Sequence, residues 1–181
     1  MSLVALVTKA KSPLLAETLR KVAPPFLEAG WTVAGDPALA QTWATILPEA
    51  PLLGAPDLAT LDPLPDLCLV LGGDGTLLAG ARKVGGRGVR IVGNERGSLG
   101  LPNAPAAQAA GDVVRTFLSN GLRPDVRKLL EVELWREGRC LLRQEVLNDA
   151  VLAKGTLARI LDLSLRLGDE DAGPLKADGV I

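Results

Sequence analysis

The 181-residue chain has no histidine, only two cysteines and no long apolar run. Without histidine, Ser-His-Asp and Cys-His nucleophilic catalysis and His-ligated zinc sites are excluded, so an acid or base catalyst must be a carboxylate, a lysine or a cysteine. Cys68 and Cys140 form no C-x-x-C pair, and we expect both to be small buried hydrophobic residues in a reducing compartment. The sequence therefore predicts no metal site built from protein side chains.

Charge and hydropathy narrow the class of protein further. Twenty Lys and Arg against 21 Asp and Glu give a formal net charge of -1, so no global basic field is available to attract nucleic acid or an anionic membrane. No apolar run reaches the roughly 18 residues that a membrane-spanning helix needs. The first residues also lack the pattern of a secretory signal. We expect a cytoplasmic protein with no nucleic-acid or membrane partner.

The first 119 residues alternate between predicted strands and helices, which is typical of an α/β domain. Continuous apolar runs predict buried strands, and apolar residues at helical spacing predict helices. A helix is expected to start at Ser12-Pro13 and to end or kink at Pro24 and Pro25. The proline-rich residues 48–65 are expected to form a surface loop. The remaining strands are predicted at 3–7, 31–34, 67–71 and 89–92, and the remaining helices at 37–47, 77–84 and 106–118.

From residue 120 onward the pattern changes to strand-like stretches separated by polar turns. Strands are predicted at 129–135, 140–152 and 160–167. We expect residues 120–181 to be a partial β-sandwich, the first strands of an incomplete antiparallel domain. The chain stops within the apolar start of what looks like another strand, which leads us to expect a truncation at Ile181.

A glycine-rich pentapeptide follows the predicted strand at 67–71 and precedes a predicted helix. Glycines allow backbone amides to approach phosphate oxygens, and the positive end of the helix dipole points toward them. Asp-Gly is also a hairpin signal, but the continuous apolar strand before it and the helical pattern after it favour phosphate binding. An aspartate among such amides needs a cation or faces a hydroxyl nucleophile, and both indicate phosphoryl transfer. The five residues are Gly72, Gly73, Asp74, Gly75 and Thr76.

With this motif the sequence resembles the NAD kinase family and, more distantly, the lipid kinases that share the Gly-Gly-Asp-Gly-Thr signature. Two further segments carry the resemblance. Leu147-Asn-Asp-Ala-Val-Leu152, followed by Lys154-Gly155, is similar to the family's Leu-Asn-Glu segment. Lys176-Ala-Asp-Gly-Val-Ile181 is similar to its Arg-Ala-Asp-Gly-Leu-Ile segment. The three motifs occur in the family's order and cover the chain from residue 67 to its end.

The resemblance implies a Rossmann-like nucleotide-binding domain that phosphorylates the 2′-hydroxyl of the adenosine ribose of NAD with ATP and Mg²⁺, giving NADP. Asp74 would be the catalytic base, and the four other loop residues would help to bind the nucleotide. A homo-oligomer, dimer or tetramer, is also implied. The further site residues would be Asn148 and Asp149 at the adenosine, Arg159 and Lys176 near phosphates, and Asp178 near the nicotinamide.

Most of these residues also have a purely structural interpretation. The sequence also departs from the family pattern in places. Asn148 and Asp149 also fit a turn, and Arg159, Lys176 and Asp178 also fit surface or turn charges. Glu95-Arg-Gly-Ser-Leu-Gly-Leu101 has glutamate and leucine where the family has asparagine and an aromatic residue, and Asp149 stands where the family has glutamate. Two other functions remain open: a lipid or sphingoid-base kinase, and a catalytically silent nucleotide-binding module.

Overall fold

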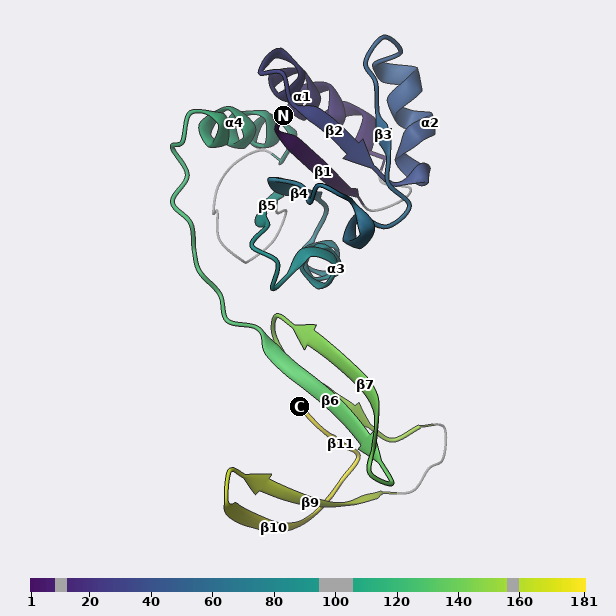
Figure 1. The fold of residues 1–181 in the computed structure, drawn as a ribbon, viewed down its shortest axis with the longest axis vertical. Helices are drawn as coiled ribbons and strands as arrows, with labels where there is room; N and C mark the ends of the chain where they lie inside the picture. Colours follow the sequence, from purple (N-terminus) through teal and green to yellow (C-terminus); the bar gives the residue numbers. More distant parts are fainter. Residues whose placement is uncertain (9–12, 95–105, 156–159) are drawn as a thin grey trace. The chain divides into compact units, whose positions relative to one another are not determined.

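A computed structural model describes residues 1–8, 13–94, 106–155 and 160–181 of the chain. These residues form two compact units, Met1–Leu129 and Leu130–Ile181 (Figure 1). The first unit is a parallel sheet with helices, and the second consists of small antiparallel sheets. The prediction of an α/β fold followed by antiparallel strands is therefore confirmed.

The first unit is built on a five-stranded parallel sheet with the order β3-β2-β1-β4-β5. This order is that of the first five strands of a doubly wound dinucleotide-binding sheet. All five residues of the interior strand β4, which lies between β1 and β5, are buried, and this explains its unbroken apolar sequence. The strands are β1 (Leu3–Thr8), β2 (Thr32–Gly35), β3 (Leu53–Gly54), β4 (Leu67–Leu71) and β5 (Arg90–Asn94).

Helices cover both faces of this sheet (Figure 1). Helices α1 (Leu15–Glu28), α2 (Pro37–Ile46) and α4 (Ala106–Leu118) pack on one face, and α3 (Asp74–Val84) and the 3-10 helix η1 (Leu58–Thr60) pack on the other. Alternate residues of β1 supply the two cores: Val4 and Leu6 face α1, whereas Ala5 and Val7 face α3. None of the helices in the described segments combines the length and apolar character needed to cross a bilayer.

Helix α1 continues through its two prolines. The sequence predicts that α1 ends or kinks at Pro24 and Pro25. The first alternative is wrong, because α1 runs to Glu28 and the amide of Ala29 still donates to the carbonyl of Pro25 at 3.2 Å. Each proline removes one backbone donor, but tertiary packing outweighs this loss. The side chain of Phe26, one position after the prolines, is completely buried in the core.

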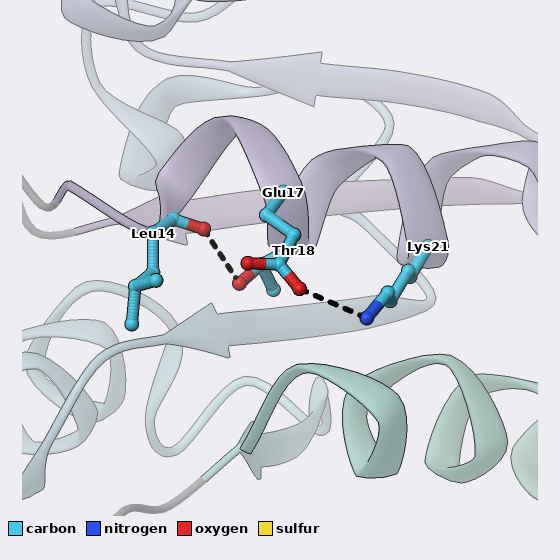
Figure 2. A network of polar contacts seen from close by, with 4 residues as sticks. All are labelled: Leu14, Glu17, Thr18 and Lys21. Atoms are coloured by element: carbon cyan, nitrogen blue, oxygen red, sulfur yellow. Dashed lines mark hydrogen bonds and ion pairs between the residues drawn. The ribbon is translucent and has the colours of Figure 1, made fainter. Parts of the chain in front are cut away.

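The first turns of α1 carry two polar contacts, one made by a buried side chain and one exposed to solvent. The amide of Thr18 donates to the carbonyl of Leu14 at 2.9 Å, and the Thr18 hydroxyl donates to the same carbonyl at 2.8 Å (Figure 2). This bond satisfies the hydroxyl of a buried side chain. On the exposed side Lys21 Nζ lies 3.0 Å from Glu17 Oε1, a spacing of one helical turn. The helix thus directs its charges to solvent and its apolar side to the sheet.

Residues 48–65 do not form a simple surface loop, so this prediction is wrong in part. They contain β3, which pairs with β2, and η1, which is capped by the Asp57 carboxylate accepting from the amide of Ala59 at 3.0 Å. Ala55 and Leu58 are buried under the sheet face that also carries α3. These two elements were not predicted because the segment is rich in proline and neither element is long enough to show a hydrophobic period.

The described residues of the second unit form three two-stranded antiparallel sheets, in which β6 pairs with β7, β8 with β11 and β9 with β10. The predicted strand at 140–152 is two strands separated by a bend, and β10 is missing from the prediction because Gly173 and Pro174 interrupt its strand pattern. The strands are β6 (Leu130–Arg136), β7 (Arg139–Val146), β8 (Leu152–Ala153), β9 (Leu161–Leu167), β10 (Glu170–Ala177) and β11 (Gly179–Val180).

The two long hairpins of this unit each have an apolar face and a charged face. In the β6–β7 hairpin Leu134 lies opposite Leu142, while the alternate pair of Glu133 and Arg143 forms an ion pair. The β9–β10 hairpin repeats this pattern. No described residue of the second unit is buried. The prediction that both cysteines are buried is accordingly wrong for Cys140, which is exposed on β7.

Candidate functional site

The glycine-rich loop joins the carboxyl end of β4 directly to α3. Gly72 follows Leu71, the last residue of β4, and Gly73 is the capping residue before α3. The helix begins at Asp74 and not at residue 77, as the sequence predicts, because the carbonyl of Gly73 accepts from the amides of Thr76 at 2.8 Å and Leu77 at 3.1 Å. The motif therefore occupies the carboxyl edge of the parallel sheet, where open α/β sheets bind ligands.

Gly72 allows the loop to fold closely onto the first turn of α3. A side chain at this position would collide with the Thr76 hydroxyl, and the added Cβ would lie 2.7 Å from Thr76 Cβ. Thr76 therefore covers Gly72 and holds the turn between strand and helix. Glycine is required here for close approach, in agreement with the interpretation of the loop from the sequence.

The amides at the start of α3 are open to a ligand. The amides of Asp74 and Gly75 have no acceptor among the residues that the structure describes, as expected for the first positions of a helix. A Cβ added at Gly73 or Gly75 would meet no atom within 4 Å. Open amides, free space and the positive end of the helix dipole together form a favourable environment for phosphate.

The Asp74 carboxylate stands at this same helix end. The residue is exposed, and within the described part of the chain it forms no ion pair. An ionised carboxylate only accepts hydrogen bonds, so it can bind a ligand hydroxyl directly. The loop therefore places a hydroxyl acceptor next to phosphate-binding amides.

Close packing fixes the position of α3 against the sheet. A Cβ at Gly80 would lie 3.0 Å from Val70 Cγ2 and 3.6 Å from Cys68 Sγ, so this glycine lets the helix approach β4. Burial raises the pKa of the Cys68 thiol to about 12, and the nearby Lys83 ammonium acts in the opposite direction. Cys68 is thus a neutral packing residue beneath the helix that presents Asp74.

The second unit holds a separate group of predicted site residues around the β8–β11 ladder. Asn148 and Asp149 are exposed in the bend before β8, and Asp178 is the residue before β11. Gly179 pairs with Ala153 and Val180 with Leu152. This pairing brings the polypeptide near Asn148 and Asp149 to the same small sheet as Asp178.

Lys154 anchors Asp178 through both backbone and side chain. The amide of Lys154 donates to the Asp178 carbonyl at 2.9 Å, and Lys154 Nζ lies 2.6 Å from Asp178 Oδ1. No role for the Lys154 side chain is predicted from the sequence. Its contact with Asp178 depends on the pairing of β8 with β11, which the sequence does not predict because each strand has only two residues.

The other predicted residues of this unit are placed differently. Lys176 lies on β10 and pairs with Asp162 on β9 at 3.3 Å, with both side chains almost fully exposed. Arg159 and the segment at 95–101 lie outside the described residues. The structure thus brings predicted site residues together within two groups, one in each unit: the loop at 72–76, and Asp178 with the β8 segment.

Metal-ligating side chains do not gather in the parts of the chain that the structure describes. Within residues 1–8, 13–94, 106–155 and 160–181, no group of three Cys, Asp or Glu residues is close enough to hold a metal ion. The loop offers a single carboxylate, that of Asp74.

The sequence matches curated relatives over its larger part, although no family model matches it. It is 39% identical over 115 residues to the NAD kinase of Nitratidesulfovibrio vulgaris, covering 64% of this chain and 41% of that protein. It is 38% identical over 118 residues to the NAD kinase of Geobacter sulfurreducens, covering 65% and 42%. With the NAD kinase of Acidobacterium capsulatum it shares 38% identity over 150 residues, which is 81% of this chain and 50% of that protein. The chain spans about half the length of these relatives.

Solved structures show the same fold. The chain is similar to yeast NADH kinase complexed with NADH, with a TM-score of 0.82 and 21% identity, over 99% of this chain and 56% of that one. It is also similar to an NAD kinase from Archaeoglobus fulgidus in complex with ATP, with a TM-score of 0.59 and 18% identity, over 98% and 58%. Its sequence relatives and its fold agree, and the chain belongs to the NAD kinase family.

Proposed function

We propose that the chain carries the phosphoryl-transfer site of an NAD kinase, which uses ATP to phosphorylate the 2′-hydroxyl of the adenosine ribose of NAD. One observation carries the proposal: the Asp74 carboxylate and two open backbone amides lie together at the N-terminus of α3, directly after β4. The names of the sequence relatives favour NAD as the acceptor over a lipid or sphingoid base.

The loop residues suggest how the transfer proceeds. The amides of Asp74 and Gly75 bind phosphate oxygens, while the Asp74 carboxylate orients the ribose hydroxyl and accepts its proton. The hydroxyl oxygen bonds to the γ-phosphorus of ATP as the bond from that phosphorus to the bridging oxygen of ADP breaks. Thr76 contributes by holding Gly72 and hence the turn.

In our proposal, the predicted site residues of the second unit also have nucleotide-binding roles. Asn148 and Asp149 suit hydrogen bonds to the adenosine, and Asp178 suits the nicotinamide side. Arg159 and Lys176 would bind phosphates. The Lys154 ion pair supports this proposal because it neutralises Asp178, so that the carboxylate does not repel the pyrophosphate of the ligand.

Magnesium fits this site as an ion carried by the substrate. Mg²⁺ is commonly bound through one or two protein carboxylates together with substrate phosphates and water. Asp74 is the carboxylate that would contact such an ion, and the described residues offer no cage of three ligands. The ion would neutralise charge on the phosphates of bound ATP.

A cytoplasmic homo-oligomer, dimer or tetramer, completes the proposal. The exposed apolar faces of the two hairpins in the second unit support self-association, because soluble monomers rarely leave such faces uncovered. Size-exclusion chromatography with light scattering measures the state directly. A mass that stays at one chain over a wide concentration range would contradict an oligomer.

The acceptor is tested by offering the purified chain NAD, NADH and a sphingoid base, each with ATP and Mg²⁺. We expect a phosphorylated dinucleotide from NAD or NADH and no phosphorylated lipid. Phosphorylation of the lipid alone would replace the proposed function with that of a lipid kinase. Nucleotide binding without any phosphorylated product would replace it with that of a silent binding module.

A further inference from the structure

A depression of about 350 Å³ lies at the amino ends of the parallel strands in the first unit. Its walls include Ser2 before β1, Trp31 before β2, Asp66 before β4 and Arg90 at the start of β5. The loop at 72–76 follows the carboxyl end of β4, so it lies at the opposite edge of the sheet. The depression therefore goes beyond the proposed phosphoryl-transfer site.

Arg87 is one of the residues that line this depression, and its guanidinium is held in place by neutral groups. Its Nη1 donates to the Ala59 carbonyl and its Nη2 to the Lys83 carbonyl, each at 2.6 Å. These two bonds fix the planar group but leave several of its five N–H donors for a ligand. No carboxylate among the described residues neutralises its charge, and the same holds for Arg90.

Trp31 adds an aromatic ring and a further open donor. Its ring packs on Phe26 and Phe117 at centroid distances of 5.4 and 5.9 Å, so its orientation is fixed. The indole N–H groups of Trp43 and Trp135 each donate to a protein oxygen, at 2.8 and 2.7 Å. The indole of Trp31 has no such acceptor in the described part of the protein, although a half-buried indole N–H usually has one.

The remaining walls complete a pocket with a net positive charge. Asp66 is the one acidic residue among the described residues of its lining, and Asp66 Oδ2 already accepts a hydrogen bond from the amide of Leu3 at 2.8 Å. Leu64, Pro65 and Val89 supply an apolar surface. The volume is near the lower end of the range of about 300 to 1,000 Å³ that is typical of small-molecule sites.

We propose that this depression is a second ligand site, for a small aromatic anion. The planar ring would lie against Trp31 and the apolar wall, and a phosphate or carboxylate group would bind Arg87 and Arg90. Phosphate and carboxylate share the geometry that guanidinium groups recognise with two parallel hydrogen bonds.

The site is tested by following the three tryptophan indole N–H signals of the full chain by ¹H–¹⁵N NMR, with Trp31 assigned by Trp31→Phe. Phenyl phosphate and benzoate are titrated as the two anions, inorganic phosphate as an anion without a ring, and benzyl alcohol as a ring without charge. We expect a saturable shift of the Trp31 signal with an aromatic anion, weaker binding of inorganic phosphate and none of benzyl alcohol. The backbone amide signals of Gly73 and Gly75 should not shift when the aromatic anion is added.

Arg90→Ala is the decisive variant, because Arg87 also tethers two backbone carbonyls and its loss would disturb the fold. Removing a charge-assisted hydrogen bond should weaken binding of the aromatic anion about tenfold or more. Arg82→Ala, an exposed arginine of α3 outside the depression, is the matched control and should bind as the parent does. Absence of a saturable Trp31 shift, or equal affinity in Arg90→Ala and the parent, would overturn the proposal.

Discussion

At the scale of single residues, two glycines of one loop have different tasks. Gly72 has no room for a side chain because Thr76 covers it, whereas a Cβ at Gly75 would meet nothing within 4 Å. The first glycine is needed by the fold. The second, in our proposal, is needed by the ligand, because its open amide and free space are where a phosphate would bind.

Alanine at each glycine should separate these tasks. Gly72→Ala should lower the free energy of unfolding by about 1–3 kcal/mol, since overpacking forces Thr76 and the turn to move. Gly75→Ala should leave that free energy unchanged or raise it by up to about 1 kcal/mol, because alanine favours helix. Its methyl group should nevertheless slow NADP formation about tenfold or more, comparable to losing one oriented donor. Urea unfolding and a coupled NADP assay measure the two effects, and an active, stable Gly75→Ala protein would contradict our assignment.

The two cysteines should differ sharply in reactivity. The Cys68 thiol is completely buried, and its pKa of about 12 leaves almost no thiolate at pH 8. Cys140 is exposed on β7. A disulfide reagent at pH 8 should therefore modify one thiol quickly and the second only on unfolding, and Cys140→Ser should remove the fast phase. Equal rates for both thiols in the native protein would contradict the placement of β4 in the core.

At the scale of elements, α2 shows how one side chain defines a helix start. The Asp36 carboxylate accepts from the amide of Leu39 at 2.9 Å, and Pro37 occupies the first helical position. Asp36→Ala should lower the free energy of unfolding by about 0.5–2 kcal/mol. Asp36→Asn should keep most of the stabilisation that the cap provides, because asparagine is also a favourable N-cap residue. Thermal or urea unfolding of the two variants tests this, and equal losses would mean that the cap contributes little.

Elements with a strong local pattern could be predicted from the sequence, and those that depend on tertiary contacts could not. The apolar runs of β1 and β4 suffice because both strands are covered on two faces. Helix α1 does not end at Pro24 and Pro25 because burial of Phe26, a tertiary effect, favours its continuation. Strand β10 was not predicted from the sequence because its pairing with β9 includes a bulge and Gly173 at positive φ.

The same distinction applies to the candidate site. The loop at 72–76 is contiguous, so its chemistry can be interpreted from the sequence, and only the helix start was placed three residues late. The ion pair of Lys154 with Asp178 joins residues that a whole hairpin separates. No local pattern predicts it. The depression around Trp31 could not be predicted either, because its walls come from the starts of four strands that are far apart in the sequence.

At the scale of the whole molecule, the two units differ in how much they bury. The first has cores on both faces of its sheet, and the second has no buried residue in its described part. Local stability follows buried apolar contacts. Amide hydrogen exchange should therefore be slowest in β1 and β4 and much faster throughout β6 to β11. Mass spectrometry of peptides from the exchanged chain measures this, and protection of the β6–β7 hairpin equal to that of β4 would contradict the difference.

The central claim is that Asp74 serves as the base in phosphorylation of NAD, and one measurement tests it most directly. NADP formation from NAD, ATP and Mg²⁺ is compared between the parent chain and Asp74→Asn, with circular dichroism as the control for folding. We predict NADP from the parent and a rate lower by about 10² to 10⁴ in the variant, the range that a positioned acid or base contributes. Equal rates in both proteins, or no NADP from the folded parent, would contradict the account.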